Sequence, residues 1–361
     1  MVAYIRELAV KKKQWLSEET FQSGAALCQS IPGATAIQTA AYVGLRAGGP
    51  RGAVAAYIGF ALPAFVLMVA LSALYQAGRD LKPVLSAFHG LNVIVIAVIT
   101  NAAITFGRAS LKNWRDILLA VVAAVFLVLH GSPILMIGAA ACLGLLLYRG
   151  VDLPAAGRQS PSEGSVRRWM LVPILLLLLM AGGLIVLFFL DRKLLDLTLV
   201  MLKVDVFAFG GGFASVPLML HEVVDVRHWL DSRTFMDGIA LGQVTPGPIV
   251  ITATFVGYQV AGLLGALVAT VAVFSPSFLM VLVTVPYFDR LQKSSLFRRC
   301  LRGVLASFVG LLLAVAISFG LSVAWSIPAV VLAVLAFAAL LLKVDILWVV
   351  LVGAGLSVFV L

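Results

Sequence analysis

The chain has few charged residues and few cysteines, and both scarcities exclude classes of protein. Charged residues make up 12% of its 361 residues, against about 25% in a soluble domain. Its three cysteines, Cys28, Cys142 and Cys300, are scattered, so neither a disulfide framework nor a metal-ligand spacing is present. The motifs GxxxxGK[ST], HExxH and GxSxG are also missing, and no basic run carries the interleaved aromatics of a nucleic-acid surface. These absences predict a protein that is not an enzyme, binds no nucleic acid and holds no metal or cofactor.

What the chain does have is apolar sequence in long runs. Hydrophobic residues make up 62% of it, and the mean hydropathy is +1.10. Runs such as Ile174–Met180 do not alternate with polar residues, as the strands of a membrane barrel would. Several segments reach the ~20 residues that a helix needs to cross the lipid bilayer. We therefore expect an all-α polytopic integral membrane protein.

Two breaks interrupt apolar segments that would otherwise be helical. In Gly242–Ala253 the break is Pro246-Gly247-Pro248, and in Cys28–Thr39 it is Pro32-Gly33. Proline lacks an amide hydrogen and restricts the residue before it, and glycine permits backbone angles that other residues avoid. Freed backbone groups are tolerated inside a membrane only where protein buries them or a polar cavity receives them. Matching breaks in two halves are a sequence pointer to a transporter site built from discontinuous helices.

The order of segments repeats along the chain. Matched residues lie 214 positions apart before a one-residue gap and 213 positions apart after it. Such a constant offset over about ninety residues indicates duplication. We expect an N-terminal half at 1–149, a linker at 150–168 and a C-terminal half at 169–361. The matched pairs are Trp15 and Trp229, Phe21 and Phe235, Gln29 and Gln243, Pro32 and Pro246, Gly44 and Gly257, Gly52 and Gly265, Pro63 and Pro276, and Gly90 and Gly303.

Equivalent loops of the two halves differ in charge. Loop 79–82 has a net charge of +1 against +4 for 289–302, whereas loop 108–116 has +2 against 0 for 320–326. Lys and Arg accumulate in cytoplasmic loops, so this alternation predicts halves of inverted topology in the cytoplasmic (inner) membrane. The N-terminus and the central linker would be cytoplasmic. In each of the two remaining loop pairs the first-half loop is the more basic: 46–51 against 259–265, and 6–19 against 222–233.

Together these motifs resemble the chromate ion transporter family over essentially the whole chain. The resemblance implies two homologous halves and a secondary transporter that exports chromate and, in some members, handles sulfate. Two features depart from the family pattern: Ala34 follows Pro32-Gly33 where a second proline is usual, and the glycine-rich helix of the second half has no counterpart after Met1. The stretches that carry the resemblance are Phe209–Pro217, Glu222–Val224, Trp229-Leu230, Ala240–Ile249, Phe255–Gly257, Phe274–Phe278, Trp15–Phe21 and Leu62–Phe65.

The half-helices that begin after the breaks predict a binding site for a tetrahedral dianion. Helix N-termini offer unpaired amides and the positive end of the dipole, and hydroxyl and amide side chains are further ligands. The alternative is that the prolines only kink helices for packing, and the glycine run could equally serve close helix contact. The candidate substrate-binding residues are Gln243, Thr245, Pro246, Gly247, Pro248, Thr252, Gln29, Pro32, Gly33, Thr35, Gly210, Gly211 and Gly212.

Four charged residues are candidates for energy coupling. Lys203 and Asp205 lie inside an apolar segment and are predicted to form an intramembrane ion pair, which is costly and often functional. Glu222, with Glu7 as its expected first-half counterpart, is a proton carrier, a cap partner for nearby amides or a salt-bridge partner of Arg227.

Three functional hypotheses follow. The first is a chromate exporter that works by alternating access, confers chromate resistance and draws energy from the membrane potential or an ion gradient. The second is a transporter of sulfate or another oxyanion. The third is a non-transporting assembly subunit, which applies if the chain is a paralogue truncated at its start. The expected partners are the oxyanion and the lipid bilayer, and a homodimer is one open option for the assembly.

Overall fold

The computed structural model describes residues 1–78, 81–149, 171–287 and 294–360. All regular structure in these ranges is helical, which confirms the predicted fold class. Five helical stretches there are long and apolar enough to cross a membrane: Thr35–Gly78, Val84–Ser110, Val172–Leu190, Ile249–Tyr287 and Ser295–Ser322. The predicted linker at 150–168 lies outside the described residues.

Each half contains a helical hairpin whose tip is the predicted break. In the first half α2 (Glu18–Ser30) folds back on the start of α3 (Thr35–Gly78). The two helices are joined by a hydrogen bond of 3.3 Å that Tyr42 Oη donates to the Thr20 carbonyl. In the second half α11 (Ser232–Val244) folds back on the start of α12 (Thr252–Thr284). There Gly238 lies against the Phe255 ring.

At the two hairpin tips the predicted breaks reverse the direction of the chain. The helices α2 and α11 have 13 residues each, about 20 Å of helix, which is less than the ~30 Å of the bilayer core. They enter the protein and return, as re-entrant segments do. A proline–glycine tip supplies the reversal, because it removes amide donors and permits unusual backbone angles at the same place.

A second reversal follows each hairpin. The backbone leaves helical geometry at Gly48–Gly49 in α3 and at Ala261–Gly262 in α12. After it the chain turns back so closely that a Cβ on Gly44 would lie 2.3 Å from the Gly52 carbonyl oxygen. The equivalent glycines of the second half make the same approach, at 2.2 Å. The small residues that the repeat conserves at a 213-residue offset therefore let two backbones touch.

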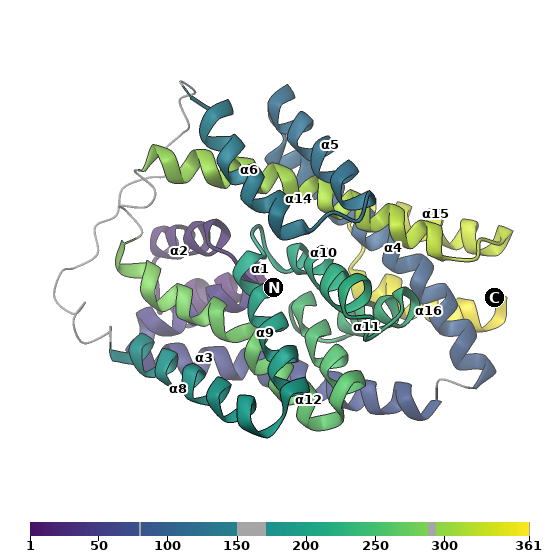
Figure 1. The fold of residues 1–361 in the computed structure, drawn as a ribbon, viewed down its shortest axis with the longest axis horizontal. Coiled ribbons are helices and arrows are strands. Elements are labelled where there is room, and N and C mark those ends of the chain that lie inside the picture. The colour runs from purple at the N-terminus through teal and green to yellow at the C-terminus, as the bar shows by residue number, and fades with distance from the viewer. Residues whose placement is uncertain (79–80, 150–170, 288–293, 361) are drawn as a thin grey trace.

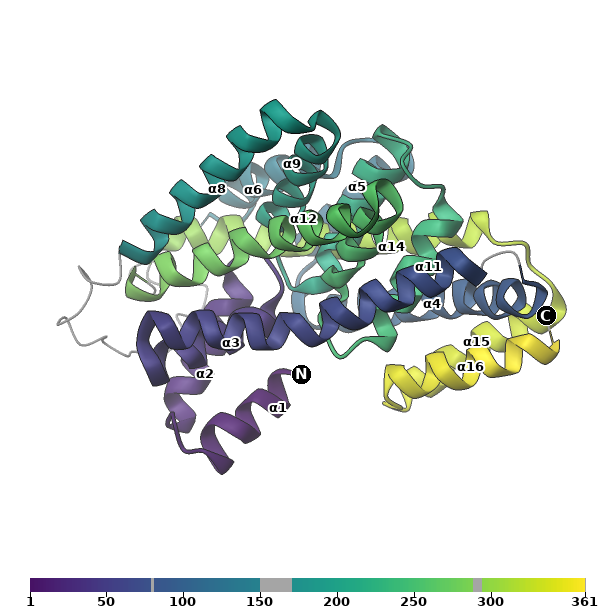
Figure 2. The same ribbon diagram turned by 90° about the horizontal axis from the view of Figure 1, so that it is seen from below.

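The long helices of the two halves interlock (Figures 1 and 2). Helix α14 (Ser295–Ser322) packs on α4 (Lys82–Ser110), α5 (Trp114–Val128) and α6 (Pro133–Leu147) of the first half. In exchange α4 packs on α15 (Ile327–Leu341) and α16 (Ile346–Val360) of the second half. Helices α5 and α6 form a short hairpin, and α15 and α16 form another. Helix α8 (Leu171–Leu190) packs against α9 (Arg192–Phe207) and α12.

A third hairpin precedes α11 in the second half. Its first arm is α9, and its second arm is η2 (Gly212–Ala214), α10 (Ser215–Leu220) and the π-helical η3 (His221–Val226). The glycine run joins the two arms. The short segment η4 (Ile249–Ile251) leads into α12, and η5 (Val285–Tyr287) follows it.

The N-terminal α1 (Val2–Arg6) and η1 (Glu7–Lys12) repeat the backbone of α10 and η3. Lys13 and Arg227, which end the two π-helices, share φ −98° and ψ −16°. This register makes Leu8 the equivalent of Glu222, so the expected match between Glu222 and Glu7 was wrong by one residue. No second glutamate stands at that place in the repeat.

One polar cluster fastens the two halves. Asp116, fully buried near the start of α5, accepts hydrogen bonds from Arg302 Nε at 3.0 Å and Nη2 at 2.9 Å. The amides of Lys112 and Asn113 and the hydroxyl of Tyr148 donate to the same carboxylate. The bidentate geometry and the filled acceptor positions make this a stabilising pair.

We expect Arg302→Ala to lower the free energy of unfolding by about 3–5 kcal/mol, because it leaves a buried carboxylate without its cation. Thermal unfolding of the purified protein in detergent measures the loss. Arg108→Ala, at an exposed position, is the control. The double variant Asp116→Leu, Arg302→Met removes both charged side chains and should be more stable than Arg302→Ala. If the double variant is no more stable, the cluster does more than balance charge.

Candidate functional site

The tips of the three hairpins meet in the interior of the protein. The Gly33 amide donates a hydrogen bond to the Ala208 carbonyl at 2.8 Å, which joins the first tip to the glycine loop. A Cβ on Gly211 would lie 3.4 Å from Thr35 Oγ1, and one on Gly212 would lie 3.1 Å from the Ile249 side chain. The loop 208–212 therefore touches the other two tips.

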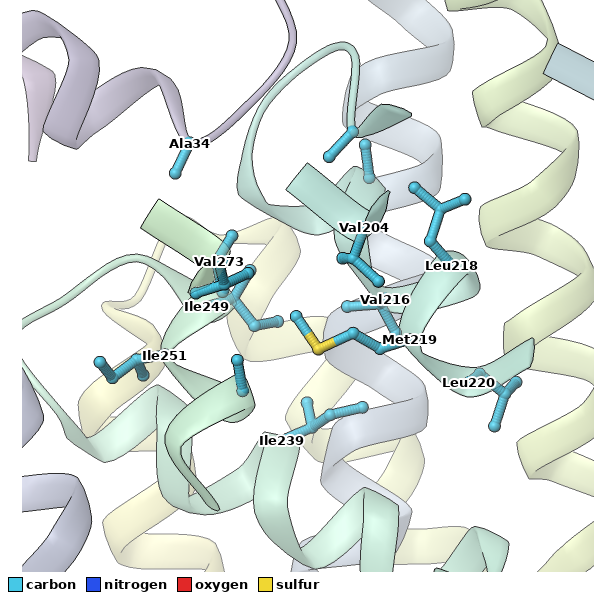
Figure 3. Packing of buried hydrophobic residues seen from close by; sticks show 14 of the residues in the cluster. Ala34, Val204, Val216, Leu218, Met219, Leu220, Ile239, Ile249, Ile251 and Val273 are labelled. Atoms are coloured by element: carbon cyan, nitrogen blue, oxygen red, sulfur yellow. The ribbon is translucent and has the colours of Figure 1, made fainter. Parts of the chain in front are cut away.

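Figure 3 shows the same convergence among apolar side chains. Ala34, Val204 and Ile249, one from each hairpin, lie around one region of the core. The breaks predicted from two distant stretches of sequence are thus brought together, with the glycine loop between them. The structure supports a shared site at the tips over two independent kinks.

Each tip rests on the proline-containing span of the opposite half. Gly33 has φ 111°, and a Cβ there would lie 1.8 Å from Ser277 Oγ of α12. A Cβ on Gly247 would lie 2.5 Å from the Ala64 Cβ of α3. Ser277 and Ala64 are equivalent residues, each following the matched proline. The halves are therefore related at the site by an approximate two-fold exchange of contacts.

One side chain at the tips carries a hydrogen-bond donor that nothing uses. Gln243 Nε2 is buried and has no partner among the described residues. An unpaired buried donor costs about 1–3 kcal/mol, so it indicates a group that an acceptor completes. In the first half Gln38 Nε2 instead donates to the Pro32 carbonyl at 2.5 Å, and its Oε1 is unpaired. Gln38 was not among the candidate site residues, although it stands beside the first break.

Two of the three threonine hydroxyls at the tips already donate hydrogen bonds to backbone carbonyls. Thr245 Oγ1 donates to the Gly242 carbonyl and Thr252 Oγ1 to the Ile249 carbonyl, both at 2.8 Å. These hydroxyls can accept but have no proton left to offer an anion. Thr35 Oγ1 has no such bond in the described structure and faces the glycine loop.

The tip prolines and Gln29 divide between the interior and the surface. Pro32 and Pro248 are buried, whereas Pro246 and Gln29 are exposed. The glutamine pair of the repeat is therefore not equivalent in environment, since only Gln243 presents a buried donor. The first turns of α3 and of η4 with α12 begin at the tips and direct their positive ends there.

The predicted ion pair between Lys203 and Asp205 is absent. Residues two apart on a helix point in different directions, and here Lys203 Nζ lies 2.6 Å from Glu222 Oε1. Asp205 instead accepts hydrogen bonds from the Ser277 amide at 2.6 Å and from Ser277 Oγ at 2.8 Å.

Asp205 satisfies a backbone amide at the kink that Pro276 makes in α12. The proline gives no amide hydrogen to α12, and two polar side chains satisfy the opened turn: Asp205 receives the Ser277 amide and Tyr57 donates to the Phe274 carbonyl. Because Gly33 packs on Ser277, this bond also positions the first tip. We interpret Asp205 as a positioning residue.

Glu222 belongs to a paired network between the arms of the third hairpin. It contacts both Lys203 and Arg227, and Arg227 binds Asp196 through Nε at 2.8 Å and Nη2 at 2.9 Å. The salt bridge with Arg227 that the sequence offered as one alternative is present. Glu7 is exposed and pairs with Lys12 at 3.4 Å. No group of three metal-ligating side chains occurs in the described ranges.

Comparison with known proteins gives a consistent assignment. The family model described as chromate transporter matches residues 1–145 and 195–358. An uncharacterised transporter of Methanocaldococcus jannaschii is 43% identical over 100% of this chain and 89% of its own length. The chromate transport protein of Cupriavidus metallidurans is 31% identical over 94% of this chain and 82% of its own length. A probable chromate transport protein of Synechococcus elongatus is 30% identical over 86% and 77%. No solved structure matches the chain.

Gly33→Ala should destabilise the protein by roughly 2 kcal/mol or more, because it combines a left-handed φ with a clash against Ser277. Gly59→Ala, at a helical glycine with open space around it, is the matched control and should be neutral or stabilising. Thermal unfolding in detergent compares the two. Equal stability of both variants would contradict the close packing of the first tip.

Proposed function

The chain belongs to the chromate transporter family, and on that premise we propose that it is a secondary transporter that exports chromate across the cytoplasmic membrane. The observation that carries the proposal is the meeting of three hairpin tips, with an unpaired buried donor, Gln243 Nε2, shortly before the second break. Chromate is a tetrahedral dianion with oxygen acceptors on every side. It requires donors and positive potential in a place from which water is excluded.

The tips offer both. The helices that begin at Thr35 and at Ile249 direct backbone amides and positive dipole ends toward the meeting point. Gln243 adds a neutral donor, and the three consecutive glycines allow the backbone to approach the anion closely. The proposed site needs no change of charge in its ligands, so it can bind and release the anion without a large reorganisation.

Energetics favour the outward direction. An inside-negative potential expels a dianion with ~2.3 kcal/mol per charge per 100 mV. The pseudo-symmetric contacts of Gly33 with Ser277 and of Gly247 with Ala64 support alternating access, in which the two halves exchange roles.

Three contacts support the inverted topology proposed from loop charges. Asp116 and Arg302 come from two connections that the charges assign to the cytoplasm. Tyr75 and Asp237 come from two regions assigned to the outside. Lys193 Nζ donates to the Val260 carbonyl at 2.7 Å, which again joins two segments assigned to one face. In each contact, the loop charges assign both partners to the same side of the membrane.

Sulfate is the alternative substrate, since it shares the shape and charge of chromate. A transport assay with both anions, each competing with the other, separates the two cases. Transport of neither by a correctly inserted protein would favour the third hypothesis, an assembly subunit.

We expect Gln243→Leu to weaken chromate transport by roughly tenfold to a hundredfold, because a hydrogen bond to a charged ligand contributes about 1.5–3 kcal/mol. Uptake of chromate into inverted membrane vesicles measures the change. Gln29→Leu, at the equivalent exposed position, is the matched control and should transport normally. Wild-type transport by Gln243→Leu at equal expression would exclude Gln243 from the site.

Labelling of introduced cysteines tests the orientation. In a background without the three native cysteines, Ser322→Cys should react with an impermeant reagent added outside intact cells, and Lys112→Cys should not. Both positions are exposed and occupy opposite faces in the proposed topology. Reaction of both from the same side would refute inverted insertion.

A further inference from the structure

A buried carboxyl lies away from the tips and forms no ion pair. Asp237 of α11 is 4% exposed and has no salt-bridge partner among the described residues. Its Oδ2 accepts a hydrogen bond from Tyr75 Oη of α3 at 2.8 Å. Its Oδ1 is buried and has no hydrogen-bond partner. A bare carboxylate oxygen in such a place is costly unless something neutralises it.

A second unpaired acceptor stands next to it. Asn92 of α4 interacts with the same carboxyl, is 2% exposed, and its Oδ1 is also buried without a partner. Each of the two side chains thus has one buried acceptor oxygen without a donor. A proton on Asp237 Oδ1 would remove the charge and turn its unpaired acceptor into a donor.

The surroundings are apolar and hold the carboxyl in place. The Tyr75 ring packs edge-on against Phe88 and Phe255, with centroids 4.9 and 5.2 Å away. The charged groups that act on Asp237 are Arg233 and Asp231, both on the segment that begins α11. Tyr75 is the titratable group that α3 contributes, and α16, which also packs on α11, has no charged residue.

The position of Asp237 connects water with the tips. It lies six residues after the exposed Asp231 and eight before Thr245, about 9 Å and 12 Å along the helix. Gln243, the unpaired donor, is on the same helix. The partner span α3 bears both Tyr75 and Ala64, which receives the Gly247 tip. The hydrogen bond between Tyr75 and Asp237 therefore joins the second hairpin to the span that receives its tip.

We propose that Asp237, with Tyr75 and Asn92, is a proton-binding site that couples proton movement to transport of the anion. The proton comes from water at the start of α11, binds Asp237 Oδ1 and is released to water on the opposite side of the membrane later in the cycle. In the topology proposed above this face is external, so a proton is taken up as the oxyanion leaves. The direction of coupling rests on the proposed function, whereas binding of the proton does not.

Infrared difference spectroscopy of the full-length protein in lipid tests proton binding without any substrate. On acidification the wild type should develop the carbonyl stretch of a buried, protonated carboxylic acid. Asp237→Asn should lose this band, while Asp231→Asn, at the exposed start of the same helix, should keep it. Tyr75→Phe should keep the band at an altered frequency, because the carboxyl loses its hydrogen-bond donor. An unchanged titration in Asp237→Asn would overturn the proposal.

Transport tests the coupling. In proteoliposomes held at a fixed membrane potential, the chromate flux of the wild type should change several-fold with the pH on the Asp231 side. In Asp237→Asn the ratio of fluxes at the two pH values should fall to near one, and in Asp231→Asn, which keeps the Asp237 carboxyl, the ratio should stay well away from one. A wild-type pH response in Asp237→Asn would refute coupling at this residue. Absence of any wild-type flux would refute the proposed function and leave the infrared result to decide whether the site binds a proton.

Discussion

The structure depends on satisfying the backbone groups that its breaks release inside the membrane. Lipid offers no partner for a free amide or carbonyl, so each break requires protein at close range. The Gly33 amide finds the Ala208 carbonyl, the Ser277 amide finds Asp205, and the Phe274 carbonyl finds Tyr57. Two of these three bonds cross between the halves. The first tip and the kink at Pro276 therefore each need a bond from the opposite half, and the duplicated chain folds as one interlocked body.

The exchange of contacts is symmetric in backbone but not in chemistry. The contact of Gly33 with Ser277 is equivalent to the contact of Gly247 with Ala64. Only Ser277 offers a hydroxyl group to the glycine that packs on it. The counterpart of Asp237 is Ser23, and the counterpart of Gln243, whose Nε2 is buried, is the exposed Gln29. The unpaired donor and the unpaired acid both belong to α11. Each half thus receives the tip of the other, whereas the donor and the acid that can respond to an anion or a proton come from the second half.

The sequence predicted the parts of the fold that periodic patterns encode. Offsets of 213 and 214 residues identified the repeat, and Pro and Gly marked the tips. The reversal of the chain at Pro32 and Pro246 was not predictable, because a break specifies where a helix ends and not the direction that follows. The partner of Asp205 was missed because Ser277 lies 72 residues away, beyond any local pattern. Asp237 was overlooked although a signal existed: it is the one acid in the apolar stretch 235–254.

A proton site changes the energetics that the proposed exporter can use. Expulsion of a dianion alone draws ~4.6 kcal/mol from a potential of 100 mV, enough to sustain a gradient of a little over three orders of magnitude. One proton entering at Asp237 for each dianion that leaves moves a third charge in the favourable sense. The available work then rises to ~6.9 kcal/mol at the same potential, near five orders of magnitude. A single buried acid in one half is sufficient for this gain. An acid in place of Ser23 would give both halves a proton-binding site, so that a proton could bind in the same way from either side of the membrane. The asymmetry of the repeat is therefore what gives the coupling a direction.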